Sequence, residues 1–291
     1  MVRFGRPATA YSKLPSRRLI IRPGGIGDYI LSLPAIEYLR TEYTEVWVPS
    51  ALVPLIRFAE ARGIASTGID LLGLAGVEPP ARLIEALRSF DSIVSWYGAN
   101  RTKFRAQVHA LGLPFQFLNA LPEHGGRIHA ADFFLKQAGG DGFAVPKIEC
   151  PPQPTEDFAV IHPFSGSERK NWPLERFREV AARLPIPVRW CVGPDEALEG
   201  AVRLENLYEL ACWLASARVY IGNDSGITHL AAAVGVLVVA IFGASDPQVW
   251  APRGERVSVI GAGRLDEISV EKVVEAAGNA IARTGDAVRE P

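Results

Sequence analysis

The sequence is poor in cysteine and lacks the common motifs of metal sites. Its three cysteines, Cys150, Cys191 and Cys212, are odd in number, and no Cys-x-x-Cys occurs. The triplet Asp-x-Asp and the motif His-Glu-x-x-His are also missing. We therefore expect neither disulfides nor a metal ion. If the protein binds an anionic group such as a diphosphate, a lysine and helix N-termini would have to neutralise its charge in place of a metal ion.

Long apolar runs are missing too. A long uncharged stretch near the C-terminus, residues 229–245, is interrupted by Gly235. A membrane-spanning helix needs about 20 apolar residues, so this run predicts a helix followed by a buried strand. The first residues lack the apolar core of a signal peptide. We therefore expect a cytoplasmic protein.

The charges are balanced overall but uneven along the chain. The 31 Lys and Arg residues against 32 Asp and Glu residues give a net charge of −1, which argues against nucleic-acid binding through a general positive field. Residues 1–27 contain no acid and six basic residues: Arg3, Arg6, Lys13, Arg17, Arg18 and Arg22. This basic N-terminal arm has two interpretations. It is a solvated segment, or it contacts an anionic partner, either a membrane surface to which the protein is peripheral or a phosphorylated acceptor.

Strand-like and helix-like segments alternate through the chain in two blocks. Residues 145–157 carry four prolines and predict a linker. Continuous apolar runs such as residues 237–242 are typical of strands buried on both faces. The sequence therefore predicts an α/β fold with two doubly wound parallel-sheet domains, residues 1–150 and 151–291, facing a cleft. One of the expected helices covers residues 51–63.

The first candidate site follows the first strand, in the segment Gly24-Gly25-Ile26-Gly27-Asp28. Gly25 and Gly27 match the first two glycines of a dinucleotide fingerprint, but Ile30 replaces the third and the next strand ends without an acid. This disfavours a nicotinamide or flavin cofactor, and we expect none. The glycines allow a tight turn and close approach of a ligand to the backbone. Asp28 suits a helix cap, a catalytic base, or both.

Two further candidate sites follow strands of the second block. In one, Ser165 and Gly166 expose backbone N–H groups and Lys170 adds a charge suited to phosphate oxygens. In the other, a strand leads into a polar turn and a helix N-terminus, which favours an anion; its candidate residues are Asp224, Ser225, Gly226 and His229. The alternatives are a polar surface loop, a helix cap and a core histidine. The serine nucleophile motif Gly-x-Ser-x-Gly is absent.

Taken together, the three sites resemble glycosyltransferase family 9, the ADP-heptose:lipopolysaccharide heptosyltransferases. The matching segments are residues 24–40 (GGIGDYILSLPAIEYLR), residues 162–177 (HPFSGSERKNWPLERF) and residues 222–252. The last contains the pattern Asp-Ser-Gly-x-x-His-Leu-Ala-Ala-Ala and a Phe-Gly-x-Ser-x-Pro turn. Their order and spacing extend the resemblance over most of the chain.

The resemblance implies a GT-B architecture, with two Rossmann-like domains and a last helix that can cross back onto the first. It implies an inverting, metal-independent transfer of a sugar from a nucleotide-diphosphate donor such as ADP-heptose to lipopolysaccharide or another envelope glycan. In that reaction Asp28 would be the general base on the acceptor hydroxyl. The donor would be held by Ser165, Gly166, Lys170, Asp224, Ser225, Gly226 and His229.

The chain departs from the family pattern in length. The loop at residues 193–206, where the nucleobase is expected, is abbreviated, and residues 63–80 are compressed on the acceptor side. The sugar, the base and the acceptor therefore stay open. Two other functions also stay open at this point: a catalytically silent protein that binds nucleotide-sugars, and a sugar-nucleotide epimerase of GT-B shape.

Overall fold

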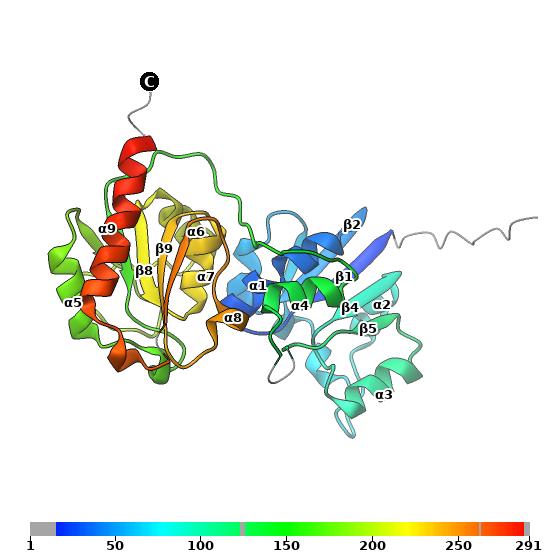
Figure 1. Cartoon of the computed structure of the whole chain (residues 1–291). Helices are drawn as coiled ribbons and strands as arrows, with labels where there is room; N and C mark the ends of the chain where they lie inside the picture. Colours follow the sequence, from blue (N-terminus) through cyan, green and yellow to red (C-terminus); the bar gives the residue numbers. More distant parts are fainter. Residues whose placement is uncertain (1–15, 123–125, 262, 288–291) are drawn as a thin grey trace, which may run out of the picture.

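The computed structural model describes residues 16–122, 126–261 and 263–287. It contains two parallel five-stranded sheets, each covered by helices, which form two lobes side by side (Figure 1). The prediction of two doubly wound α/β domains is confirmed. Most of the basic N-terminal arm, up to residue 15, lies outside the described residues. Among those that are described, no helix combines the length and the apolar character needed to cross a bilayer.

The N-terminal sheet has the strand order β3-β2-β1-β4-β5, with all neighbouring strands parallel. Its strands are β1 (Arg17–Ile21), β2 (Tyr43–Val48), β3 (Glu60–Gly63), β4 (Ser92–Ser95) and β5 (Phe115–Phe117). Its helices are α1 (Ile26–Tyr38), α2 (Ala81–Arg88), α3 (Thr102–Ala110) and α4 (Ala130–Gln137), with 3-10 turns η1 (Ser50–Leu55), η2 (Ile64–Ser66) and η3 (Ile69–Leu71).

The helix expected over residues 51–63 is wrong. The chain makes only the short turn η1 and then the edge strand β3, which pairs in parallel with β2. Pro54 cannot donate an i→i−4 hydrogen bond, so it disfavours a longer helix here. The pairing of β3 depends on the exposed edge of β2, which the local sequence does not encode.

The C-terminal sheet has the order β10-β9-β8-β6-β7, again with parallel neighbours. Its strands are β6 (Ala159–His162), β7 (Val188–Trp190), β8 (Val219–Asn223), β9 (Leu237–Phe242) and β10 (Val257–Gly261). Its helices are α5 (Leu174–Arg183), α6 (Leu207–Ser216), α7 (Gly226–Ala233), α8 (Pro247–Trp250) and α9 (Val270–Ala287), with 3-10 turns η4 (Glu168–Lys170) and η5 (Leu265–Glu267). Every residue of β8 and β9 is buried, as their apolar runs predict.

The last helix, α9, lies on the C-terminal domain and does not cross back. It packs against α5 and the sheet at the far side of that lobe from the N-terminal domain (Figure 1). Its apolar residues Val273, Ala277 and Ile281 are buried in a cluster with Phe177 and Val239. Because that stripe is already covered by its own domain, α9 has no apolar face left for the other one.

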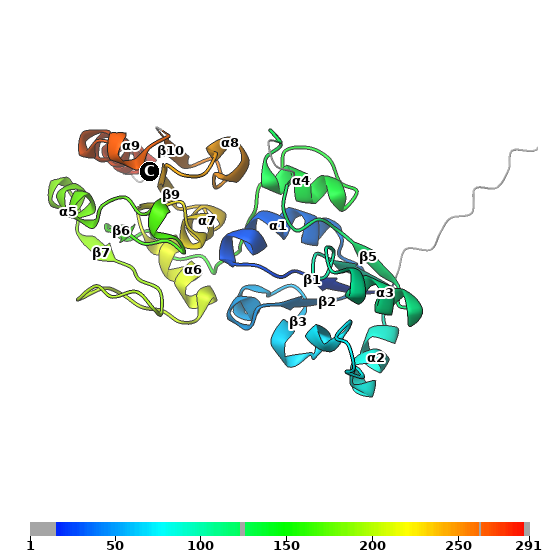
Figure 2. The same cartoon turned by 90° about the horizontal axis from the view of Figure 1, so that it is seen from below.

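The two domains meet through helices α1 and α7. Figures 1 and 2 show α1 between α4, in its own domain, and α7 of the other domain. Buried residues of α1, α4 and α7, such as Leu33, Phe134 and Leu230, belong to one continuous apolar cluster that spans the domain boundary. The carboxyl ends of β1 and β8, which lead into α1 and α7, are thereby brought to the same place.

Candidate functional site

The site lies where the N-termini of α1 and α7 touch. A Cβ atom added to Gly226 would lie 2.7 Å from Cβ of Ile26, and one added to Gly27 would lie 3.2 Å from Cδ2 of His229. Only glycine allows so close an approach of the two helices. Two first turns with free N–H groups therefore open onto one space between the domains.

That space is an interdomain cleft of about 650 Å³, a volume usual for a small-molecule site. It brings together nine of the ten residues singled out in the sequence; only Ser165 does not line it. The lining residues are Gly25, Ile26, Gly27, Asp28, Leu31, Gly166, Ser167, Lys170, Asp224, Ser225, Gly226, His229, Ser245 and Trp250.

Asp28 stands in the first turn of α1 with a third of its side chain exposed to the cleft (34%). Its Oδ2 accepts a hydrogen bond from the backbone N–H of Gly25 at 2.9 Å. Gly25 is the residue that caps the helix, and Asp28 reaches back to it from inside the helix. Gly24 takes a φ of +112°, and a Cβ there would lie 2.6 Å from Asp28 Oδ2. The turn thus fixes Oδ2, while Oδ1 lies 4.0 Å from a guanidinium nitrogen of Arg22.

Arg22 supports Asp28 through its buried guanidinium. The sequence did not indicate this role, because Arg22 is one of the six basic residues of the N-terminal arm. It is 1% exposed, donates to the carbonyl oxygen of Asp28 at 3.0 Å, and lies 4.0 Å from its carboxylate. A second hydrogen bond goes to Ser32 Oγ at 3.1 Å. Burial lowers the pKa of Arg22 to about 10, so the guanidinium remains charged at neutral pH.

Lys170 faces Asp28 from the C-terminal side of the cleft. Its Nζ donates to Asp224 Oδ2 at 2.7 Å, and the Asp224 side chain is buried. Of the two roles open to Asp224, a helix cap or an acceptor of hydrogen bonds from sugar hydroxyls, the cap is filled by Ser225, whose Oγ accepts from the N–H of Thr228. A lysine ammonium has three donors, so Lys170 can hold Asp224 and an anionic ligand together.

Ser165 has a structural position rather than a place in the cleft wall. Its Oγ donates within its own loop, lying 2.7 Å from Asn171 Oδ1 and 2.8 Å from the carbonyl oxygen of Ser167. These contacts shape the turn before η4, which carries Gly166 and Lys170 into the cleft. In the structure Ser165 thus supports its neighbours, and its direct contact with a donor stays a prediction.

His229 is buried between the two domains beside the cleft. Burial lowers its pKa to about 4; Asp224 and Asp28 oppose this, while His129 and Lys170 add to it. The imidazole is therefore neutral at physiological pH and can both donate and accept a hydrogen bond.

The buried state of His229 predicts a pH-dependent stability. As pH falls below 6.5, the unfolded chain binds a proton at this histidine that the folded chain does not, so stability is lost down to about pH 4. The destabilisation caused by His229→Gln is therefore expected to be about 2 kcal/mol smaller at pH 5 than at pH 7, measured by urea unfolding. His109→Gln, an exposed site, is the control. An equal cost of His229→Gln at both pH values would contradict the neutral buried imidazole.

Contacts made by Arg253 and His129 also link the two domains. Arg253 makes a two-pronged ion pair with Asp132 of α4 and also donates to the carbonyl oxygen of Ala144. His129, which caps α4 through Nδ1, uses Nε2–H to donate to the carbonyl oxygen of Ala251 at 2.9 Å. The segment that follows α8 is therefore held by the N-terminal domain.

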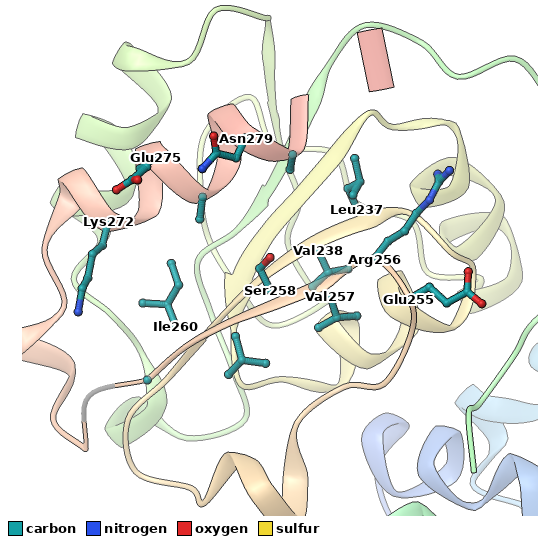
Figure 3. A pocket seen from close by; sticks show the side chains of 14 residues that line it. Leu237, Val238, Glu255, Arg256, Val257, Ser258, Ile260, Lys272, Glu275 and Asn279 are labelled. Carbon is teal, nitrogen blue, oxygen red and sulfur yellow. The ribbon is translucent and has the colours of Figure 1, made fainter. Parts of the chain in front are cut away.

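A second hollow, of about 710 Å³, lies on the C-terminal domain between β10 and α9 (Figure 3). Ser258 and Ile260 of the edge strand and Lys272, Glu275 and Asn279 of α9 line it. It lies at the sheet edge, apart from the strand-end loops where ligands of doubly wound sheets bind. The fold therefore does not favour this hollow as a ligand site.

The model of glycosyltransferase family 9 (heptosyltransferase) matches residues 144–277, which hold all the C-terminal residues of the cleft. Lipopolysaccharide heptosyltransferase 3 of Escherichia coli is 22% identical over an alignment that covers 83% of this chain and 88% of that protein.

The chain matches glycosyltransferase family 9 over its C-terminal domain.

It is a glycosyltransferase of the heptosyltransferase type, and its fold agrees. The structure of E. coli ADP-heptose lipopolysaccharide heptosyltransferase II matches with a TM-score of 0.72 at 16% identity, covering 92% of this chain and 99% of that one. The iron-containing dodecameric glycosyltransferase TibC of enterotoxigenic E. coli matches with a TM-score of 0.61 at 14% identity, covering 94% and 77%. A further structure shows TibC with ADP-D-β-D-heptose. In this chain, the described residues form no group of three or more His, Cys, Asp or Glu side chains that could hold a metal.

Five lining residues were not among the predicted ones: Ile26, Leu31, Ser167, Ser245 and Trp250. Ser245 is the serine of the Phe-Gly-x-Ser-x-Pro turn, so the resemblance contained a signal for it. Trp250 follows three residues after that turn and carries no motif. Only the contact of α8 with the other domain shows that it belongs to the site.

Proposed function

We propose that this protein transfers a heptose from ADP-heptose to a hydroxyl group of a lipopolysaccharide-like glycan, with inversion at the anomeric carbon and without a metal ion. The observation that carries the proposal is the arrangement of the cleft. A carboxylate from the N-terminal domain faces a lysine and a helix N-terminus from the C-terminal domain across a single space of about 650 Å³.

The proposed reaction is a direct displacement. Asp28 removes the proton of the acceptor hydroxyl, whose oxygen forms the new bond to the anomeric carbon. The bond from that carbon to the diphosphate oxygen breaks, and the electron pair leaves with the diphosphate. Lys170 and the N–H groups at the start of α7 stabilise the developing negative charge, so the proposal requires no metal ion.

The choice of ADP-heptose rests on the relatives. The similar E. coli enzyme is named for ADP-heptose, and TibC was solved with an ADP-heptose. In the structure, the abbreviated loop is drawn together by Arg203, which donates to the carbonyl oxygens of Gly193 and Glu196. Glu196 in turn accepts from His162 at 3.1 Å. These hydrogen bonds give the short loop a defined, compact shape.

The test is an assay of the EDTA-treated protein with ADP-heptose, UDP-glucose and GDP-mannose, each with and without heptose-deficient lipopolysaccharide. We expect ADP release only with ADP-heptose and acceptor together, and a product of inverted anomeric configuration by NMR. Conversion of a donor without acceptor would instead indicate an epimerase, and binding without turnover a silent protein. Activity only after adding iron or another metal would contradict the metal-independent mechanism.

A further inference from the structure

Trp250 is the only Phe, Tyr or Trp side chain among the described residues that line the cleft. It lies at the end of α8, which Figures 1 and 2 place at the domain boundary beside α1 and α4. It shares the lining with Asp28 of the N-terminal domain and Lys170 of the C-terminal domain. A large flat apolar surface thus borders the space in which the proposed chemistry occurs.

The position of Trp250 is fixed from both domains. Its backbone N–H donates to the carbonyl oxygen of Asp246 at 3.0 Å, and the carboxylate of Asp246 caps the same short helix at Gln248. The next carbonyl, that of Ala251, accepts the hydrogen bond from His129 of the other domain. These contacts hold the backbone, and the side chain itself packs partly against the apolar cluster that spans the domain boundary. A partly packed side chain on a fixed backbone loses little conformational freedom when a ligand covers it.

The charge distribution and apolar surface of the indole ring indicate which part of the donor it can contact. The face of an aromatic ring carries negative charge, so it repels a diphosphate, which Lys170 suits instead. A pyranose ring has one face of C–H bonds, which packs favourably on an aromatic face and is removed from water there. The group that must lie near Asp28 is the transferred sugar, since its anomeric carbon meets the acceptor hydroxyl, whereas the nucleobase lies beyond the diphosphate.

We propose that Trp250 is the stacking platform for the transferred sugar of the donor. This inference rests on the proposed function. It assigns the cleft two separable tasks: Lys170 and its neighbours bind the diphosphate whatever sugar it carries, and Trp250 recognises the sugar ring.

The test compares two ligands by calorimetry, ADP and ADP-heptose, without acceptor. Trp250→Ala is expected to weaken ADP-heptose about tenfold and ADP by less than about twofold. Trp250→Phe should retain most of the ADP-heptose affinity, and Trp250→Leu, which keeps apolar area without a ring, should lose it partly. Phe143→Ala is the control, because Phe143 is 74% exposed and packs on Arg253 outside the cleft.

The outcomes separate this inference from the proposed function. If Trp250→Ala lost as much affinity for ADP as for ADP-heptose, the ring would contact the nucleobase, and the proposal that it stacks on the sugar would be wrong. Unchanged affinity for ADP-heptose with a raised KM for the acceptor would assign Trp250 to the acceptor and also overturn it. If the wild type binds ADP but not ADP-heptose, the donor assignment and the platform both fail. If Trp250→Ala is unstable, Trp250→Leu and Trp250→Phe decide between these results.

Discussion

Asp28→Asn is expected to lower kcat for sugar transfer by about 10²- to 10⁴-fold while leaving the affinity for ADP nearly unchanged. The amide keeps the size of the side chain, and its oxygen can still accept from Gly25 N–H, so the helix start is preserved. What the variant loses is the group that removes the proton from the acceptor hydroxyl. The measurements are steady-state transfer with ADP-heptose and acceptor, and calorimetric binding of ADP.

The control for Asp28→Asn is Glu37→Gln in the last turn of the same helix. Glu37 is an exposed acid paired with Arg40, far along α1 from the cleft, so its removal should leave transfer unchanged. If Asp28→Asn turned over at the wild-type rate, Asp28 would be a structural residue of the turn and the proposed base would be wrong.

Lys170→Met is expected to weaken ADP binding by about 10- to 100-fold, the usual worth of a charge-assisted hydrogen bond. The variant has a second effect, because it leaves the buried carboxylate of Asp224 without its cation. A loss of ADP affinity in the single variant would therefore combine two causes: the lost attraction between Lys170 and the diphosphate, and the repulsion of the diphosphate by the unpaired Asp224 carboxylate.

The double variant Lys170→Met/Asp224→Asn separates the two effects. If Lys170 contacts the diphosphate, ADP binding should stay at least about tenfold weaker than in the wild type. Recovery of wild-type affinity would show instead that Lys170 only neutralises Asp224, contrary to its proposed role. Arg169→Met, which removes an exposed neighbouring charge outside the cleft lining, is the control for net charge.

These experiments together divide the cleft into parts. Asp28 with its support Arg22 comes from β1 and α1, the anion site from the loops after β6 and β8, and the aromatic platform from α8. Because α1 and α7 touch through Gly27 and Gly226, these parts border one shared space. Binding of ADP, binding of ADP-heptose and turnover must therefore be measured separately for each variant.

The sequence by itself determined the fold class and most of the cleft. Alternating apolar runs and helical patterns specify buried parallel strands, and ligands of such sheets bind just after the strands. The short polar turns at Asp28, Lys170 and Asp224 could therefore be identified as site segments before their contacts were known. These features are local, so each one can be seen in a few consecutive residues.

Only the tertiary structure decided what depends on partners far away in the chain. The edge strand β3 forms because β2 offers an open edge, and α9 stays on its own domain because its apolar stripe is covered there. Arg22 becomes a support for Asp28, and Trp250 joins the cleft beside the hydrogen bond of His129, just before α4, to Ala251, just after α8. Packing brings together residues that are distant in sequence, and no local pattern records which of them will meet.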